Sequence, residues 1–320
     1  MKNLRIKVLF GVVIVWTLSI FLPQACKKPH IILQEDLNIG DDQGDENLIF
    51  GRVSSLGFDS QDNIYILDWK TWRVQKFDSQ GAFLESISIQ KGQGPQEITF
   101  PGIMAISPQG KIFLYDFMAW KVLILDQDGR YLNSFNLDFY GIDIGNTGDE
   151  SLIVMGDKNK KLFHVYDIQG TLIRSFGDHF EVPQNLARFD FPTVKYPQDF
   201  KCSRQGRIYV CDPHRYEISV YRNEELEEII KGSNAAFLPV SVKNGRDVTL
   251  TGVSVFEVGN RVYSFIHSHG EVPNQLDVFD RKRQIASLDV TGYARAVDSQ
   301  GRLYFTEEEP FPRIIRYVVK

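Results

Sequence analysis

A short motif recurs six times along the chain and constrains the fold more than any other feature. Its fullest copies, at residues 59–66 (DSQDNIYI) and 298–305 (DSQGRLYF), join a polar turn to a run of apolar and aromatic residues. Self-similarity at such a period indicates that each unit is one supersecondary structure and that neighbouring units bury a shared core. The aligned apolar residues, spaced by 48, 40, 56, 54 and 41 residues, are Ile64, Ile112, Leu152, Ile208, Val262 and Leu303.

Within each unit, short apolar runs alternate with tight polar turns. Three units carry an Asp-x-x-Gly turn, at residues 78–81, 126–129 and 167–170, in which Asp bonds to its own turn and Gly accepts a positive φ. The runs are about five residues long and almost none shows helical periodicity. Residues 224–230 favour a helix by composition but fall where a fourth strand belongs. We therefore predict an all-β fold, a six-bladed β-propeller with four antiparallel strands per blade.

The sixth unit is one strand short, because the chain ends after strands near residues 294–297, 302–305 and 313–319. An apolar segment at residues 30–37 precedes the first unit and has no other role. If this segment supplies the missing strand, it joins the two ends of the ring and leaves neither edge open. The sequence thus predicts one propeller domain over residues 31–320, with Ile32 paired near Tyr317.

The first 30 residues have the pattern of an export signal. Three basic residues precede residues 8–22, an uncharged run of 15 that is shorter than the roughly 20 residues of a membrane helix. Ala25 and Cys26 then resemble the lipobox of bacterial lipoproteins, with Pro23 in place of the usual aliphatic residue. The resemblance implies a signal peptide at residues 1–25, a tether at 26–30 and lipidation of Cys26. An uncleaved anchor or a plain secretory signal is the alternative.

The repeat resembles NHL-type six-bladed propellers. The lipobox and the loop at residues 91–97 (KGQGPQE) resemble the six-bladed β-propeller lipoproteins of Gram-negative bacteria, in which a Gly-x-Gly-Pro-x-Glu segment links early blades. This resemblance implies a cell-envelope protein that is lipid-anchored to the outer membrane and faces the periplasm or the cell surface. It implies no chemistry, since most members of that family have no assigned activity.

The two faces of such a propeller carry different loops. The connections between blades and between second and third strands share one face, here called the connection face, and the short polar turns form the opposite hairpin face. The connection face contains the long segments 90–102, 177–199 and 232–248, which are typical of binding sites. We predict a ligand-binding site there, formed by Trp69, Arg73, Gly94, Pro95, Glu97, Phe117, Trp120, His214, Arg215, His267 and His269.

Several of these positions have a structural alternative. Trp72, Trp120 and Tyr216 each follow an Asp by four residues, and repetition in register favours packing between blades. The glycines of residues 92–95 are expected to bend the chain over the channel, with Glu97 bonded to backbone amides. A phosphate loop is disfavoured because neither Lys-Ser/Thr nor a helix follows. The repeated acidic residues, which are expected to bond loop amides, are Asp68, Asp116, Asp157 and Asp212.

Three classes of function fit this pattern. The first is non-catalytic binding of a glycan, a peptide or a partner protein by aromatic side chains, without a cofactor. The second is a metal-dependent lyase or lactonase, since His267 and His269 lie two residues apart near Glu271. The third is a structural subunit of an envelope assembly. A net charge of −5 argues against a nucleic-acid partner, and no Ser-His-Asp, nucleophile-elbow or His-Glu-x-x-His motif predicts a catalytic residue.

Two cysteines fall in the predicted propeller. A simple hairpin register places Cys202 opposite Tyr209 and leaves Cys211 diagonal to it, which is poor geometry for a disulfide. Although an exported protein permits disulfides, the expectation is two thiols.

Overall fold

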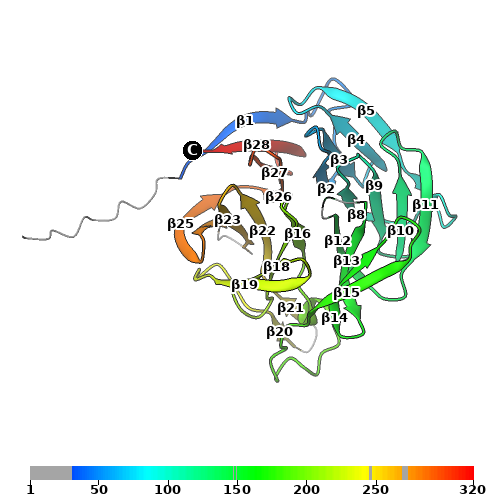
Figure 1. The fold of residues 1–320 in the computed structure, drawn as a ribbon. Coiled ribbons are helices and arrows are strands. Elements are labelled where there is room, and N and C mark those ends of the chain that lie inside the picture. Colours follow the sequence, from blue (N-terminus) through cyan, green and yellow to red (C-terminus); the bar gives the residue numbers. More distant parts are fainter. Residues whose placement is uncertain (1–30, 147, 149, 245–246, 269–272) are drawn as a thin grey trace, which may run out of the picture.

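The computed structural model describes residues 31–146, 148, 150–244, 247–268 and 273–320. Six four-stranded antiparallel sheets surround a central channel (Figure 1). In five of these sheets the strand nearest the channel is the first in the chain, and the next three follow outward in order; in the sixth, β26 is innermost and the N-terminal β1 (Leu33–Ile39) is outermost. The predicted six-bladed propeller is therefore confirmed.

The blades have the following strands. Blade 1 contains β2 (Val53–Phe58), β3 (Ile64–Asp68), β4 (Arg73–Phe77) and β5 (Phe83–Ser88). Blade 2 contains β8 (Pro101–Ile106), β9 (Ile112–Asp116), β10 (Lys121–Leu125) and β11 (Tyr131–Asn136). Blade 3 contains β12 (Gly141–Asn146), β13 (Leu152–Lys158), β14 (Lys161–Tyr166) and β15 (Leu172–Asp178). Blade 4 contains β16 (Phe200–Cys202), β17 (Arg207–Cys211), β18 (Glu217–Arg222) and β19 (Glu225–Lys231).

Blade 5 contains β22 (Gly252–Val258), β23 (Arg261–His267), β24 (Asn274–Asp280) and β25 (Arg283–Val290). Blade 6 contains β26 (Tyr293–Val297), β27 (Leu303–Glu307), β28 (Arg313–Val319) and the N-terminal β1 (Leu33–Ile39). Each of the six aligned repeat residues lies on the second strand of its blade. The segment with helix-favouring composition forms β19, as its position in the repeat predicted.

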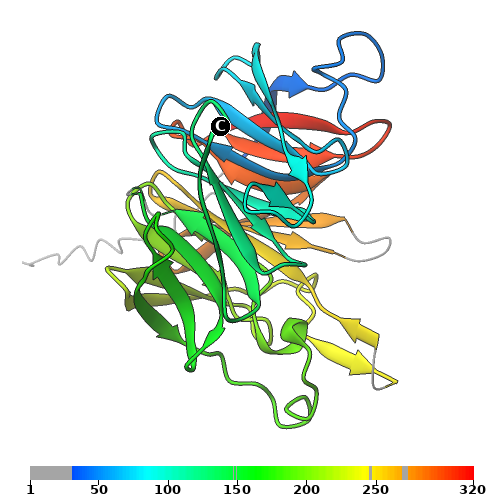
Figure 2. The same cartoon turned by 90° about the vertical axis from the view of Figure 1, so that its right-hand side faces the viewer.

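The blade connections add a few short elements on the connection face. Strands β6 (Gln90–Lys91) and β7 (Glu97–Ile98) pair in parallel, and β20 (Ser241–Lys243) and β21 (Asp247–Thr249) form a hairpin. This hairpin and the single-turn helix α1 (Pro192–Lys195) lie on the same side of the ring (Figure 2). Over the ranges that the structure describes, no helix has the length and hydropathy of a membrane span.

The hydrophobic core is divided among the six junctions between neighbouring blades. The second strands are buried on both faces, so successive side chains contribute to two different clusters. In β3, Ile64 and Ile66 pack toward blade 6, whereas Tyr65 and Leu67 pack toward blade 2. The same division recurs around the ring, which explains why these strands read as continuous apolar runs in the sequence.

The Asp-x-x-Gly turns have the chemistry that the sequence predicted. Asp78 Oδ1 accepts hydrogen bonds from the backbone N–H groups of Gln80 and Ala82, both at 2.8 Å. Gly81 and Gly129 have φ values of 84° and 79°, where a side chain would be strained. These turns join the third and fourth strands of their blades on the hairpin face.

The N-terminal strand closes the ring in the predicted way. Strand β1 pairs with β28, and the backbone groups of Ile32 and Lys320 exchange two hydrogen bonds of 3.0 and 2.9 Å. Arg316 of β28 is 4% exposed, and its guanidinium donates to both carboxylate oxygens of Asp36 at 2.8 and 3.1 Å. Because β1 precedes blade 1 and completes blade 6, this pairing connects the beginning of the ring to its end.

The predicted register of the cysteine hairpin is wrong by one residue. Cys202 pairs with Ile208, and Lys201 lies opposite Tyr209. The turn is closed by Ser203 and Arg207, which moves the pairing by one position. No disulfide joins Cys202 to Cys211, both of which lie in the described part of the chain, and Cys211 is buried.

Candidate functional site

The central channel holds a cavity of about 630 Å³, within the size range of small-molecule sites. The first strands of all six blades line it. Each of these strands runs from the connection face to the hairpin face, so its first residues mark the end of the channel at the connection face. The apolar part of the wall includes Ile103, Met104, Ile144, Val253 and Phe256.

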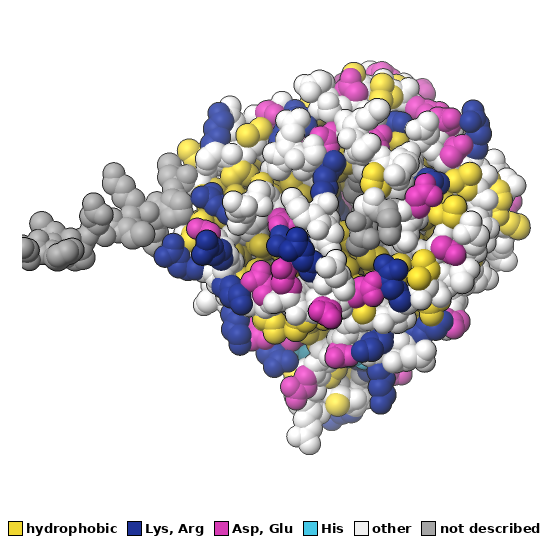
Figure 3. Space-filling view, in the orientation of Figure 1, with side chains coloured by type: hydrophobic (Ala, Val, Ile, Leu, Met, Phe, Trp, Pro, Cys, Tyr) yellow, Lys and Arg dark blue, Asp and Glu magenta, His cyan; other side chains and the backbone are white. Residues whose placement is uncertain are grey.

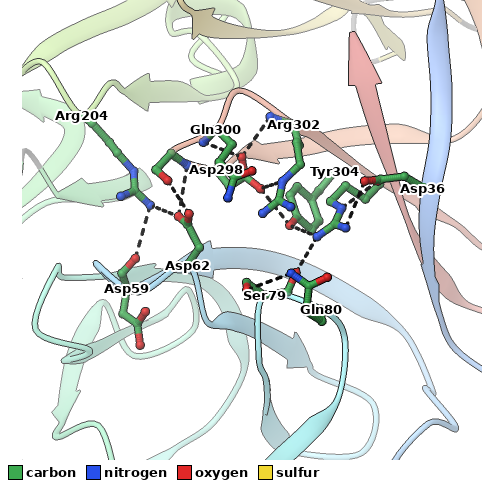
Figure 4. A network of polar contacts seen from close by, with 12 residues as sticks. Asp36, Asp59, Asp62, Ser79, Gln80, Arg204, Asp298, Gln300, Arg302 and Tyr304 are labelled. Atoms are coloured by element: carbon green, nitrogen blue, oxygen red, sulfur yellow. Dashed lines mark hydrogen bonds and ion pairs between the residues drawn. The ribbon is translucent and has the colours of Figure 1, made fainter.

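The channel is crossed at its hairpin-face end by an ion pair. Asp62 belongs to the first hairpin of blade 1, and Arg204 belongs to the equivalent hairpin of blade 4, on the opposite side of the ring (Figure 4). The Arg204 Nη2 atom lies 2.6 Å from Asp62 Oδ1, and Ser299 of blade 6 donates its backbone N–H to the same oxygen at 3.1 Å. This contact lies across the hairpin-face end of the channel.

Figure 3 shows the ring in the orientation of Figure 1, which presents the hairpin face, with acidic and basic side chains interspersed over it. Neither sign of charge gathers into one large patch in this view. The charged residues that distinguish the channel are instead those of its inner wall.

Polar side chains from four blades, four of them charged, gather in the half of the channel near the connection face. Asp143 comes from blade 3, Asp199 and Lys201 from blade 4, Ser254 from blade 5 and Arg295 from blade 6, and all five line the cavity. The Asp199 Oδ2 atom accepts a hydrogen bond from Ser254 Oγ at 2.6 Å and lies 2.9 Å from Lys201 Nζ. These residues form the channel cluster.

Asp143 links the inner strands of two blades. Its Oδ2 atom accepts a hydrogen bond from the backbone N–H of Phe200 at 3.0 Å, and its Oδ1 atom accepts one from Ile144 at 2.9 Å. Burial raises the pKa of Asp143 to about 7, with Lys201 opposing the shift and Asp199 adding to it. Burial lowers the pKa of Lys201, but the two carboxylates outweigh this effect and raise it overall. The cluster therefore keeps a cationic lysine beside a carboxyl group that titrates near neutral pH.

Arg295 reaches the channel because it occupies a β-bulge. Ala294 pairs with Phe305 and Ala296 pairs with Tyr304, which leaves Arg295 without a partner on the neighbouring strand. A bulge re-aims the side chain of its extra residue. The Arg295 Nε atom donates to Thr306 Oγ1 at 3.0 Å, and its guanidinium carbon lies 5.5 Å from the centre of the Tyr293 ring.

One predicted residue, His267, lines the same cavity. Its ring stacks on Tyr293 with centroids 5.1 Å apart and planes inclined by 23°. Tyr293 is 44% exposed, so the stacked pair borders the end of the channel at the connection face. His269, which was predicted to act with His267, lies outside the described residues, as do Glu271 and Cys26.

The predicted aromatic residues lie further out on the connection face. Trp69 packs on Phe100 with centroids 5.2 Å apart. Phe117 packs edge-on against Tyr115 and stacks on Tyr140, which also contacts Trp120. None of these residues lines the channel. The structure therefore does not bring the predicted aromatic residues together with His267.

The three residues repeated in register occupy equivalent backbone positions in their blades. The carbonyl oxygens of Trp72, Trp120 and Tyr216 each accept one from the residue that begins the following connection, at 2.8, 2.7 and 2.9 Å. Tyr216 is 7% exposed and donates its hydroxyl to Asp277 of the next blade at 2.7 Å. Trp120 differs in being 42% exposed.

Most of the repeated Asp residues behave as predicted. Asp68 accepts hydrogen bonds from the backbone N–H groups of Gly51 and Arg52 at 2.7 and 2.9 Å. Asp116 does the same for Thr99 and Phe100. The prediction for Asp157 is corrected, since it accepts from the Tyr196 hydroxyl at 2.6 Å and lies 3.2 Å from His179. This Asp holds the long 177–199 connection against blade 3.

The loop that contains Gly94, Pro95 and Glu97 is bonded to itself and to blade 2. Glu97 Oε2 accepts a hydrogen bond from the Gly94 N–H at 2.8 Å, as predicted. Lys121 Nζ donates to the carbonyl oxygens of Gly94, at 2.9 Å, and Glu97. The expected bend over the channel is wrong, because residues 90–102 pack on Trp72 and Lys121 and do not line the cavity.

The remaining predicted residues have structural contacts. Arg73 Nη2 donates to the backbone carbonyls of Glu46 and Ile49 at 3.1 and 2.6 Å, which fixes the segment before blade 1. His214 is 7% exposed, and burial lowers its pKa. Arg215 is exposed, with its Nε atom 3.0 Å from Asp212 Oδ2.

Within the described ranges, no group of three or more His, Cys, Asp or Glu is placed to hold a metal ion. The sequence predictions missed Asp143, Asp199, Lys201, Ser254 and Arg295. A usable signal was present, since Asp143, Lys201 and Arg295 are charged residues in first strands that, apart from Asn146 and Glu257 toward their ends, carry apolar or small residues elsewhere.

The fold and the channel define the class of the protein as a six-bladed β-propeller with a ligand-sized central cavity. A family model described as 6-bladed beta-propeller matches residues 43–230, and the chain belongs to this family. No curated protein matches the sequence.

Solved structures share the fold at low sequence identity. A protein described as exported, from Bacteroides fragilis NCTC 9343, is 14% identical with a TM-score of 0.64, over 91% of this chain and 95% of that one. A DUF4221 family member from Bacteroides vulgatus is 11% identical with a TM-score of 0.60, over 92% and 99%. Virginiamycin B lyase from Staphylococcus aureus is 11% identical with a TM-score of 0.52, over 90% and 99%.

Proposed function

We propose that this protein is a non-catalytic binding protein of the cell envelope, anchored by a lipid on Cys26, whose ligand occupies the central channel. The observation that carries the proposal is the cavity of about 630 Å³, which combines apolar walls with the channel cluster. Sites of this kind orient a ligand with a few polar groups and bury the rest of it against apolar side chains. The ligand enters from the connection face, because the Asp62–Arg204 pair lies across the other end.

The location in the envelope rests on the lipobox-like sequence and is consistent with the exported bacterial protein of the same fold. A glycan fragment or a short peptide suits the cavity volume better than a folded partner does. Labelling with a radioactive fatty acid tests the anchor directly. Wild type should incorporate label, whereas Cys26→Ala should not; equal labelling of both proteins would contradict lipidation at this residue.

The channel site is tested by ligand retention. Full-length protein in detergent is incubated with small molecules extracted from its native envelope, washed and denatured, and the released molecules are identified by mass spectrometry. Ser54 lines the cavity from a bulge in β2, so Ser54→Tyr should place a phenol ring in the channel, obstruct it and abolish retention. A matched control, Trp120→Ala, removes an exposed ring outside the channel and should leave retention unchanged.

Two results would contradict the proposal. If Ser54→Tyr still retained the ligand and Trp120→Ala no longer did, the binding site would lie on the outer aromatic residues. Near-stoichiometric metal in protein purified without chelator, with conversion of the retained molecule, would instead support the metal-dependent enzyme.

A further inference from the structure

The channel cluster has more hydrogen-bond donors than acceptors left for a ligand. Arg295 carries five N–H groups, of which Nε is bonded to Thr306. Among the described residues, neither η nitrogen of Arg295 has a hydrogen-bond partner, and the side chain lines the cavity. Lys201 has three N–H groups, and only its contact with Asp199 involves a side chain.

The acidic members of the cluster are largely occupied. Both oxygens of Asp143 accept backbone N–H groups, and Asp199 Oδ2 receives both Ser254 and Lys201, which leaves Asp199 Oδ1 as the one carboxylate oxygen of the cluster without a bond to another described residue. A ligand cation would meet this single oxygen beside the positive charges of Lys201 and Arg295, whereas a ligand anion would meet donors that are free. The fork of a guanidinium matches the two oxygens of a carboxylate, and such paired bonds are stronger than bonds between neutral groups.

Resting on the proposed function, we infer that the ligand is a ring-bearing carboxylate whose carboxyl group binds the η nitrogens of Arg295. His267 lines the cavity, and its stacking partner Tyr293 lies against the Arg295 guanidinium, so aromatic side chains that a sugar or aromatic ring can contact adjoin the carboxylate site. Val253 and Phe256 contribute apolar surface to the same cavity.

Inorganic phosphate would make only part of this interaction. The free donors of Arg295 would meet either anion, but phosphate has no ring for the aromatic and apolar side chains of the channel wall to bury. The site is therefore expected to bind a ring-bearing carboxylate in preference to inorganic phosphate.

The inference is tested by calorimetric titration of the full chain in detergent. The probes are sodium D-glucuronate as an acidic sugar and sodium benzoate as an aromatic acid, with D-glucose and inorganic phosphate for comparison, all at constant ionic strength. At least one carboxylate should bind, and it should bind tenfold or more tightly than the other two compounds. Which carboxylate binds better distinguishes a sugar acid from an aromatic acid.

The variants locate the bound carboxylate. Arg295→Gln should weaken its binding tenfold or more, and Ser54→Tyr should abolish it. Arg130→Gln removes an exposed arginine of blade 2 as a matched control and should bind like wild type. Unchanged affinity in Arg295→Gln, or tighter binding of phosphate, would overturn the inference. The inference would also be overturned if only D-glucose bound and Ser54→Tyr abolished that binding. That result would still leave the channel as the binding site.

Discussion

Tyr216 gives the sharpest stability prediction, because its hydroxyl joins two blades through a buried charge. The hydroxyl donates to Asp277 at 2.7 Å; Asp277 is fully buried, and its other carboxylate oxygen is bonded to Asn234 at 2.8 Å. Burial raises the pKa of Tyr216, so the hydroxyl keeps its proton and remains a donor. Tyr216→Phe preserves the packed ring and removes only this donor.

The expected loss follows from the charge of the acceptor. A hydrogen bond to a charged group contributes about 1.5–3 kcal/mol, and its removal leaves the buried carboxylate of Asp277 with one side-chain donor fewer. An unfolding entropy of about 2.1 cal/mol/K per residue corresponds to about 0.6 kcal/mol/K for a propeller of this length. The unfolding midpoint of Tyr216→Phe should therefore fall by about 2.5–5 °C.

The assay is thermal unfolding followed by circular dichroism at pH 7. The matched control is Tyr140→Phe, since Tyr140 is 40% exposed and no hydrogen bond of its hydroxyl is present among the described residues. Its midpoint should change by less than about 1 °C, as is usual at surface positions. Equal midpoints for the two variants would refute the argument that register-repeated residues hold neighbouring blades together.

Three further predictions concern closure, a turn and a titrating carboxyl group. Arg316→Ala leaves Asp36 without its bidentate partner, so it should lower the free energy of unfolding, measured in urea, by about 2–3 kcal/mol and speed proteolysis near β1. An unchanged rate of cleavage would contradict this prediction. Gly129→Ala should lower the free energy of unfolding by about 2–3 kcal/mol, and Gly206→Ala should lower it by about 1 kcal/mol. Both glycines have a positive φ, but only a Cβ at position 129 would meet a side chain, that of Ile87 at 2.5 Å. Equal losses would show that this steric clash contributes nothing. The pKa of Asp143 is raised to about 7, so the folded state holds a proton that the unfolded state releases above about pH 4. The stabilisation from this bound proton is complete below about pH 4 and is lost as the pH rises through 7. Asp143→Asn cannot release a proton in this range, so it should flatten the pH dependence of the unfolding midpoint between about pH 4 and 7.

The fold could be predicted from the sequence because each repeat contains the apolar runs and turn residues of one blade. The apolar run at Ile64 and its five counterparts is buried on both faces, and this requirement is visible residue by residue. Closure was predictable because the sixth unit lacked a strand and one unassigned apolar segment could supply it. The cysteine register was not, because one residue more or less in the turn after Cys202 leaves the hydrophobic pattern almost unchanged.

The candidate site was harder to predict because it depends on which side chains reach the channel. Aromatic residues such as Trp69 and Phe117 stand out in the sequence, but they pack on neighbours at the outer part of the connection face. Arg295 stands in an ordinary strand and reaches the cavity only through a bulge. A bulge is set by pairing with the next strand, and neither composition nor spacing reveals it.

The central claim, that the channel is the ligand site, is tested most directly by a crystal structure of the protein purified from its native envelope with ligand retained. We predict ligand density within the channel, beside Arg295 and the His267–Tyr293 pair. Density confined to the outer aromatic residues around Trp120, with none in the channel, would contradict it.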